Sequence, residues 1–228
     1  MGEVGIELVH GTGGTAPQQD MDLSMEALAA LRNGEGGRLR VHSPRPTAAF
    51  SRLDTLAPGH PDAAVAAGRH GFAPVVRPAG GRLAAYHRGA LVLDLVAPHP
   101  DARTTLRERF VAAADCLVNG LRALGVDART GPVPGEYCPG DYSVNARGTT
   151  KLVGTAQRAT KFGYLFSAVV LVADPEPVRA VLTDTYPLLG LSWDPGTVGC
   201  VADHVPGITV EEVSAVLAEP FLRLVPTS

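Results

Sequence analysis

The sequence predicts a mixed α+β domain built around a mainly antiparallel sheet. Strand-like segments occupy much of the first half of the chain, one long amphipathic helix lies in the middle, and further strand-like segments follow it. This order of elements favours an α+β fold over the regular strand–helix alternation of parallel sheets. The chain has 228 residues, of which 45% are hydrophobic, and this is enough for one large core.

The elements of the first half follow from apolar spacing and from the glycines and prolines between apolar runs. Helices are expected at 20–31 and 62–70, and strands at 39–42, 73–77, 82–86 and 90–96. Pro44 and Pro46 are expected to end the first of these strands. The last three strands are expected to be joined by hairpin-like turns at Gly80-Gly81 and Arg88-Gly89.

The second half contains the clearest helix, at 103–124. Its apolar residues recur at helical spacing: Leu106, Phe110, Ala114, Leu117, Leu121 and Leu124. Gly125 ends this helix, and a loop rich in proline and glycine follows. Strands are expected at 141–145, 150–154 and 164–172, and helices at 175–183 and 209–218. Residues 1–19 are expected to form an N-terminal loop segment ahead of a single domain over 20–228.

Charge, hydropathy and cysteine usage exclude several classes of protein. A formal net charge of −3 is unlike that of a nucleic-acid-binding protein. The longest apolar runs, such as 165–173, reach only about half of a membrane span. The three cysteines are widely spaced, so a reducing cytoplasm is expected in place of a disulfide framework. Cys200 and His204 have the spacing of two metal ligands, but no second pair is present and no metal is expected.

Lysine is rare in this chain. Among the 20 basic residues only Lys151 and Lys161 are lysines, and all others are arginines. Lysine is a compact ammonium whose proton can be lost on burial, whereas arginine is a wide, permanently charged fork. A site that needs a small or titratable cation cannot use arginine. Each lysine is therefore either a functional residue or a surface residue that has survived by chance.

Two segments carry residues suited to chemistry. The first runs from Arg77 through Gly80, Gly81 and Arg82 to His87. Glycines between strands let the backbone approach a ligand closely, because no Cβ intervenes. The segment is also compatible with a plain hairpin turn that carries solvated arginines.

The second segment contains Cys138 in a Pro/Gly loop and Lys151 thirteen residues later. Because Cys138 precedes a proline, its backbone is expected to be extended. A loop position is typical of an accessible, reactive thiol and not of a packed structural cysteine. A nearby ammonium lowers a thiol's pKa and can stabilise an oxyanion.

Together these segments resemble the lipoate and octanoate protein ligase and transferase family. Arg-Pro-x-Gly-Gly-Arg followed by a histidine resembles the glycine motif of that family, and Lys-x-x-Gly-x-x-Gln-Arg resembles its lysine motif. Cys-Pro-Gly-x-Tyr ahead of the lysine resembles the octanoyl-carrier amidotransferase branch. The resemblance covers roughly residues 20–185. It implies a biotin/lipoate ligase-like sheet domain with flanking helices as the catalytic domain.

The resemblance also implies roles for individual residues. Cys138 would accept the acyl group as a thioester, and Lys151 would hold the acyl carbonyl and assist proton transfer. The remaining implied site residues would surround the acyl chain: Arg77, Gly80, Gly81, Arg82, His87, Gly154 and Thr155. The implied donor is the glycine-cleavage carrier protein or another acyl carrier, and the implied acceptor is a lysine of a lipoyl domain. No cofactor, nucleic acid or membrane is expected, and a monomer is expected.

Some residues depart from the family's pattern and leave alternatives open. Ala79 stands where a hydroxyl residue is common, and Arg88 follows His87 where relatives often have aspartate. These departures bear on the identity of the donor. One alternative is an adenylating, ATP-dependent lipoate-protein ligase. The others are a non-catalytic paralogue and a paralogue recruited to a specialised pathway.

Overall fold

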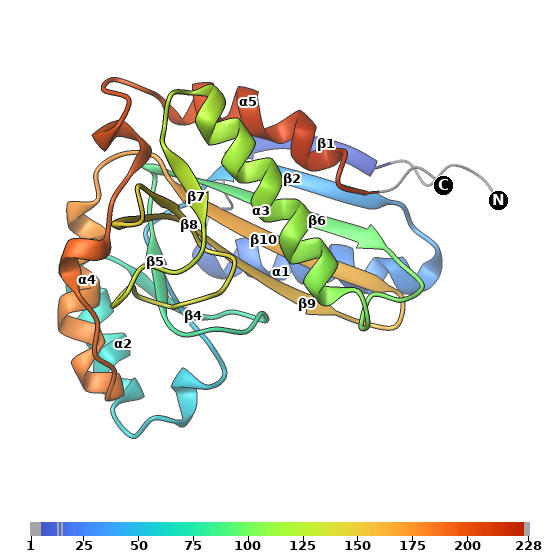
Figure 1. The fold of residues 1–228 in the computed structure, drawn as a ribbon. Helices are drawn as coiled ribbons and strands as arrows, with labels where there is room; N and C mark the ends of the chain where they lie inside the picture. Colours follow the sequence, from blue (N-terminus) through green and yellow to red (C-terminus); the bar gives the residue numbers. More distant parts are fainter. Residues whose placement is uncertain (1–5, 13, 15, 226–228) are drawn as a thin grey trace.

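The computed structural model describes residues 6–12, 14 and 16–225. Its larger sheet has seven strands in the order β1-β2-β6-β10-β9-β8-β7 (Figure 1). All neighbouring strands in it are antiparallel except β1 and β2, so the predicted sheet type is confirmed. The bounds are β1 Ile6–Thr12, β2 Gly37–Ser43, β6 Ala90–Pro98, β7 Ala128–Thr130, β8 Val144–Ala146, β9 Thr150–Ala159 and β10 Gly163–Leu171.

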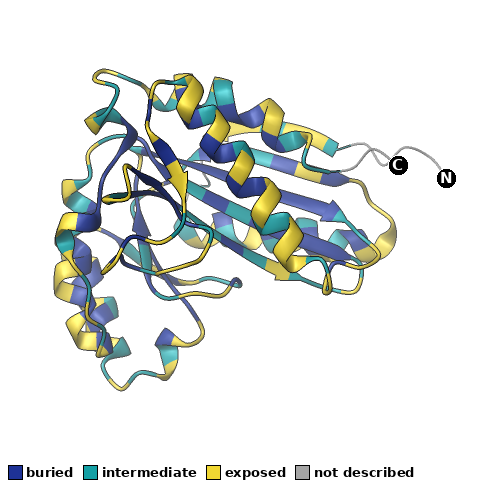
Figure 2. Ribbon diagram, in the orientation of Figure 1, coloured by how far each residue is buried: buried dark blue, intermediate teal, exposed yellow. Residues whose placement is uncertain are grey.

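Helices cover both faces of this sheet. Helices α3 (Leu106–Ala123) and α5 (Val210–Leu222) pack side by side on one face, and α1 (Pro17–Ala30) packs on the other against β6 and β10. The central strands are therefore buried on both sides, as Figure 2 shows. Such strands read as continuous apolar runs and not as alternating ones. The apolar stripe predicted along the middle helix packs into the main core.

A smaller sheet lies beside the larger one and has the order β4-β3-β5. Its strands are β3 Thr47–Phe50, β4 Ala73–Val76 and β5 Ala84–Tyr86. Helices α2 (His60–Arg69) and α4 (Glu176–Thr185) pack against each other beside it (Figure 1). Short 3-10 turns complete the described secondary structure at Leu31–Asn33, Asp54–Leu56, Pro187–Leu189, Pro195–Thr197 and Val201–Asp203.

Two of the sequence predictions for the first half were wrong. The predicted loop over 1–19 contains β1, which pairs in parallel with β2 at the edge of the large sheet. The hairpin turns were also wrong, because β4 and β5 do not pair with each other. Both flank β3, and β6 belongs to the other sheet. Strand β3 was missed because it is a short run, Thr-Ala-Ala-Phe, buried without alternation directly after Pro46.

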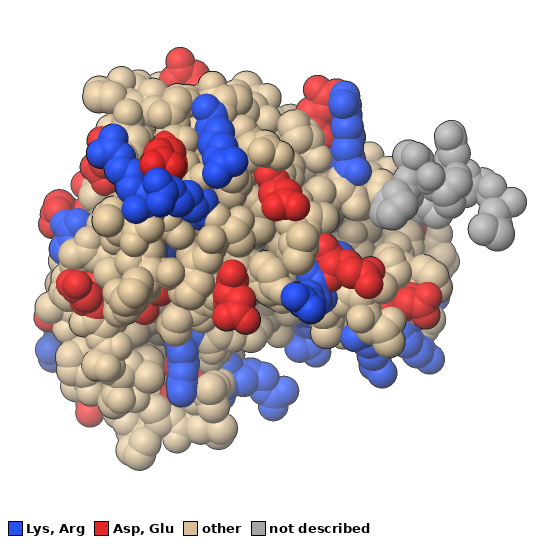
Figure 3. Space-filling model, viewed as in Figure 1, with Lys and Arg blue, Asp and Glu red and all other residues tan. Residues whose placement is uncertain are grey.

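The face of the molecule in Figure 3 shows basic and acidic side chains interspersed. Exposed side chains of opposite charge also form ion pairs, such as Arg38 with Glu7 and Arg129 with Asp127. Among the described residues, no helix is long and apolar enough to cross a membrane.

Candidate active site

Cys138 lies in the loop that connects β7 to β8. Its φ is 42°, so its backbone is left-handed and the predicted extended conformation was wrong. A non-glycine residue in this region is strained and persists only where the surroundings hold it. The Cys138 N–H donates to the Tyr186 hydroxyl at 2.7 Å, and this hydroxyl donates to the Leu83 carbonyl at 2.9 Å. Tyr186 therefore fixes the loop from outside it.

The half-buried Cys138 thiol accepts two hydrogen bonds from the glycine segment. The backbone N–H of Arg82 and the Arg77 guanidinium both lie 3.3 Å from Sγ. The guanidinium is held in turn by the Arg82 carbonyl at 2.6 Å. Burial raises the pKa of this thiol, but the charges of Arg77 and Lys151 and the two hydrogen bonds outweigh it. The net pKa is below that of an ordinary cysteine, so a larger share of this thiol is ionised at a given pH.

Lys151 is buried at the start of β9, with 2% of its surface exposed. Its ammonium donates to Glu136 Oε1 at 3.0 Å, to the Tyr137 carbonyl at 3.0 Å and to the Cys138 carbonyl at 2.7 Å. All three ammonium hydrogens therefore have acceptors on the Cys138 loop. Lys151 is a buried part of this site, and Lys161 is exposed.

Sequence reasoning missed Glu136, the buried anion that pairs with Lys151. Besides that ion pair, its carboxylate accepts from the Val133 N–H, the Gly140 N–H and the Ser143 hydroxyl. One carboxylate thus organises the whole loop around the thiol. The sequence held one clue to this residue. A buried lysine requires a nearby counter-charge, and Glu136 is an acidic residue two positions before Cys138.

A pocket of about 460 Å³ opens beside the thiol. All of the predicted site residues line it except Arg82 and His87. Its apolar wall comes largely from both sheets and α3: Ala84, Tyr86, Leu106, Phe110 and Val169. A pocket of this size and lining is typical of small-ligand sites.

Gly80 and Gly81 both line the pocket but are not equivalent. A Cβ on Gly81 would lie 2.5 Å from Arg77 Nη2 and 2.9 Å from Cys138 Sγ, whereas a Cβ on Gly80 would meet nothing within 4 Å. Gly81 also has a φ of +104°. The close backbone approach predicted for the glycine pair therefore belongs to Gly81.

Two predicted residues lie outside the pocket lining. Arg82 contributes its backbone to the thiol, while its side chain is 3.5 Å from the buried Asp54 carboxylate. His87 is buried, and its ring accepts from the Gly89 N–H and bonds to the Asp174 carbonyl at 2.8 Å. Both ring nitrogens are thus occupied by backbone groups, so His87 supports the turn and does not face the thiol.

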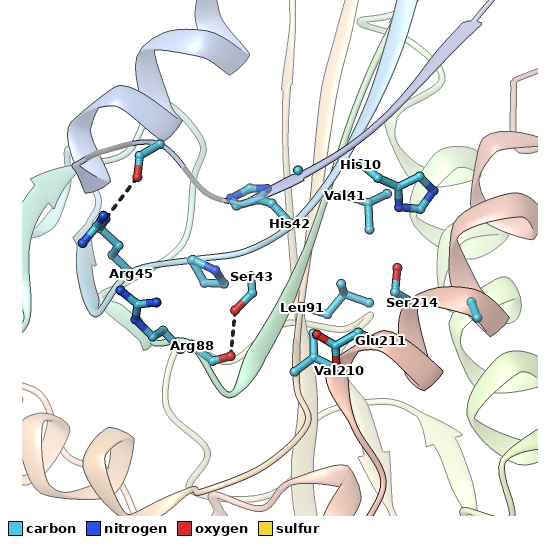
Figure 4. A pocket seen from close by; sticks show the side chains of 14 residues that line it. His10, Val41, His42, Ser43, Arg45, Arg88, Leu91, Val210, Glu211 and Ser214 are labelled. Carbon is cyan, nitrogen blue, oxygen red and sulfur yellow. Dashed lines mark hydrogen bonds between the residues drawn. The ribbon is translucent and has the colours of Figure 1, made fainter.

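A larger cavity, of about 700 Å³, lies away from the thiol between β1, β2 and α5. Figure 4 shows His10 on β1, with Glu211 and Ser214 on α5, around this space. None of the predicted site residues lines it. Within the described part of the chain, no three side chains of the metal-binding types come together as a metal site.

The electrostatics of the three thiols predict selective alkylation. Burial raises the pKa of Cys116 and of Cys200 to about 11 each, whereas that of Cys138 is lowered. At neutral pH iodoacetamide should therefore modify Cys138 first, because the thiolate is the nucleophile. Arg77→Gln should slow this modification by raising the pKa of Cys138, and the exposed Arg69→Gln should not. Peptide mass spectrometry over a pH series checks this, and equal rates at all three cysteines would contradict it.

Known proteins resemble this chain in sequence. The family model described as the lipoyl protein ligase A/B catalytic domain matches residues 61–222. An octanoyl-[GcvH]:protein N-octanoyltransferase of Geobacillus kaustophilus is 26% identical over 144 residues, 63% of this chain and 50% of that protein. A protein of the same name from Exiguobacterium sibiricum is 29% identical over 158 residues, 69% of this chain and 57% of that one. The chain thus spans about half the length of these relatives.

Solved structures share the fold. A bi-partite lipoate protein ligase from Thermoplasma acidophilum has a TM-score of 0.66 at 22% identity, covering 96% of this chain and 82% of that one. A lipoate-protein ligase A bound with ATP has a TM-score of 0.66 at 21% identity, covering 96% and 84%. These likenesses confirm the predicted biotin/lipoate ligase-like α+β fold. Because the family model also spans more than half of the sequence, this chain belongs to the lipoyl protein ligase A/B catalytic domain family.

Proposed function

We propose that this protein is an acyltransferase that carries a medium-chain acyl group, such as octanoyl or lipoyl, as a thioester on Cys138. The observation that carries the proposal is the environment of the thiol. Sγ lies in the wall of a partly apolar pocket and accepts hydrogen bonds from Arg77 and Arg82, with the ammonium of Lys151 behind its loop. These are the conditions that activate a cysteine nucleophile.

In the first half-reaction the Cys138 thiolate attacks the carbonyl carbon of the donor's acyl-lysine amide or acyl thioester. A new C–S bond forms, and the bond from the carbonyl carbon to the donor's nitrogen or sulfur breaks. The departing group takes up one proton, which balances the proton that the thiol gave up on ionisation. Each methylene of the acyl chain that is buried in the pocket contributes about 0.8 kcal/mol to binding.

In the second half-reaction the ε-amine of an acceptor lysine attacks the Cys138 thioester. A C–N bond forms, the C–S bond breaks, and the thiolate is regenerated while the amine loses a proton. In the structure all three Lys151 hydrogens are bound to the cysteine loop. Lys151 therefore acts first by charge and by positioning Cys138. To hold the acyl carbonyl directly, it would have to give up one of these three bonds.

The partners that we propose follow from the relatives. The curated relatives are named for transfer from octanoyl-[GcvH] to protein, and the archaeal neighbour was studied with its E2 lipoyl domain. We infer that the donor is a glycine-cleavage carrier protein or a similar acyl carrier, and that the acceptor is a lysine of a lipoyl domain. The free cysteines fit a reducing compartment such as the cytoplasm.

The test is acylation without nucleotide. Mixing the protein with an octanoyl-loaded carrier and no ATP should add one octanoyl group, which intact-mass and peptide analysis place on Cys138. Cys138→Ser should abolish the adduct, because a serine hydroxyl is a far weaker nucleophile near neutral pH. Cys116→Ser, which changes a thiol outside the pocket, should retain it. An adduct in the Cys138→Ser variant, or a strict requirement for ATP, would favour the adenylating ligase instead.

A further inference from the structure

Attack of the Cys138 thiolate on an acyl carbonyl places a negative charge on the carbonyl oxygen. A C–S bond forms, and one electron pair of the C=O bond moves onto the oxygen until the bond to the nitrogen or sulfur of the acyl donor breaks. Preorganised hydrogen-bond donors at such an oxyanion usually give the largest single contribution to catalysis. The hydrogen bonds around Cys138 indicate which groups can supply these donors.

The two backbone donors that nucleophiles commonly use are already bonded or missing here. In many acyl-transfer enzymes the oxyanion is bound by the N–H of the nucleophile itself or of the residue that follows it. The Cys138 N–H donates to the Tyr186 hydroxyl at 2.7 Å. The next residue is Pro139, which has no N–H. The N–H of Gly140, one residue further, donates to the Glu136 carboxylate at 3.3 Å.

The ammonium of Lys151 is also bonded elsewhere. Its three hydrogens are shared among Glu136 Oε1, the Tyr137 carbonyl and the Cys138 carbonyl, all within 3.0 Å of Nζ. To bind an oxyanion, Lys151 would have to break one of these bonds, and the Glu136 carboxylate that holds it is buried. The charge of Lys151 therefore acts on the thiol through the loop, and the hydrogen bonds to the oxyanion have to come from another segment.

Two donors on the glycine segment lie directly at the sulfur. The Arg77 guanidinium and the Arg82 backbone N–H are each 3.3 Å from Cys138 Sγ. The oxygen of an acyl group on Sγ is only two bonds away from the sulfur, so donors grouped at Sγ are also within reach of that oxygen. As the negative charge passes from the sulfur to the acyl oxygen, these two donors can follow it.

Both donors are held in place by further contacts. The Arg77 guanidinium also donates to the Arg82 carbonyl at 2.6 Å, so the two donors are joined to each other. The Arg82 side chain lies 3.5 Å from the fully buried Asp54 carboxylate, and the carbonyl of Leu83 accepts from the Tyr186 hydroxyl at 2.9 Å. Donors that are fixed in this way need little reorganisation when charge develops.

We propose that Arg77 is a catalytic residue, and that its guanidinium and the Arg82 N–H bind the oxyanion when an acyl group is transferred to or from Cys138. The proposal rests on the acyl transfer through Cys138 proposed above. Before the attack, the same two donors stabilise the thiolate. When the intermediate collapses, the electron pair returns to the carbonyl and the hydrogen bonds to its oxygen weaken.

The test uses two electrophiles to separate the oxyanion from the thiolate. Iodoacetamide reacts with the thiolate at a saturated carbon and forms no oxyanion, whereas octanoyl-N-acetylcysteamine, a small thioester, reacts at a carbonyl. Arg77→Met should raise the pKa of Cys138, so both reactions should slow near neutral pH. Above that pKa, alkylation should return to the wild-type rate, while acylation should stay about a hundredfold slower. The exposed Arg69→Gln on α2 is the matched control and should leave both rates unchanged.

The ratio of the acylation rate to the alkylation rate at high pH decides between the possible roles of Arg77. An unchanged ratio in Arg77→Met would mean that Arg77 affects only the ionisation or the placement of the thiol, and this would overturn the proposal while the proposed function stands. Wild-type protein that is alkylated at Cys138 but not acylated by the thioester or by a loaded carrier would overturn the proposed function as well.

Infrared spectroscopy of the acylated protein gives an independent readout. An isotope label at the octanoyl carbonyl identifies its stretching band, and hydrogen bonds to the carbonyl oxygen lower the frequency of this band. The frequency should be higher in octanoylated Arg77→Met than in the octanoylated wild type, because one donor has been removed. The same frequency in both proteins would contradict binding of the oxygen by the guanidinium.

Discussion

Replacing Lys151 with alanine should reduce acyl transfer through Cys138 roughly a hundredfold or more, which is the usual loss when one preorganised charged donor is removed from a site. The same change should lower the free energy of unfolding by about 3–5 kcal/mol, because it leaves the fully buried Glu136 carboxylate without its cation. Lys151→Arg should be nearly as damaging. The guanidinium is too wide for a slot in which the ammonium meets three acceptors within 3.0 Å.

A double variant separates the loss of acyl transfer from the loss of stability. Glu136→Gln with Lys151→Met removes both charges and keeps one amide oxygen to accept from Gly140 and Ser143, so chemical denaturation should show part of the stability restored. Acyl transfer per folded molecule should remain low. Lys161→Arg is the matched control, because Lys161 is exposed, and its effect on stability should stay within about 0.5 kcal/mol. Recovery of transfer in the double variant would show that Lys151 serves only the fold.

Replacing Gly81 with alanine should abolish most acyl transfer while the protein still folds. The added Cβ would lie 2.5 Å from Arg77 Nη2 and 2.9 Å from Cys138 Sγ, which is too close for either contact. The guanidinium or the thiol has to shift to relieve these contacts, and we expect the shift to weaken the hydrogen bond between them. The pKa of the thiol should then rise, because the guanidinium no longer lowers it. Valine should block the pocket further, since overpacking a formed site typically costs about 1–3 kcal/mol.

Gly80→Ala is the matched control for this prediction. A Cβ there would meet nothing within 4 Å, and stability and transfer should remain near wild type. Gly81→Ala also carries a backbone cost of about 1–3 kcal/mol, because its φ of +104° is unfavourable for alanine. Thermal melts beside the pH profile of Cys138 alkylation separate these effects. A destabilised Gly81→Ala with an unchanged profile would mean that the glycine serves only the turn.

The sequence predicted features that depend on local pattern. The long helix, the two central strands of the large sheet and the C-terminal helix lie where apolar spacing placed them. The scarcity of lysine singled out Lys151, and the loop composition singled out Cys138. These residues were recognisable because their types and flanking glycines and prolines are unusual at their positions.

Strand pairing could not be predicted in the same way. The glycine pair looked like a hairpin turn, yet β3 lies between the strands that it joins. Pairing depends on which strand can bury its backbone next to which, and residues far apart in the chain decide this. Strand β1 was missed for the same reason, because its place at the sheet edge depends on β2.

By itself the sequence determined the fold class, the family resemblance and the two residues on which the chemistry is proposed to depend. Only the tertiary structure decided what surrounds them. The left-handed turn at Cys138, its bond to Tyr186 and the pairing of Lys151 with Glu136 all join segments that no local pattern connects. The buried Asp94 likewise accepts hydrogen bonds from Ser24, Arg40 and Ser167, which lie on three other elements. The physical reason is that burial and electrostatic pairing act through space, so the cost of a buried charge is set by neighbours that are distant in sequence.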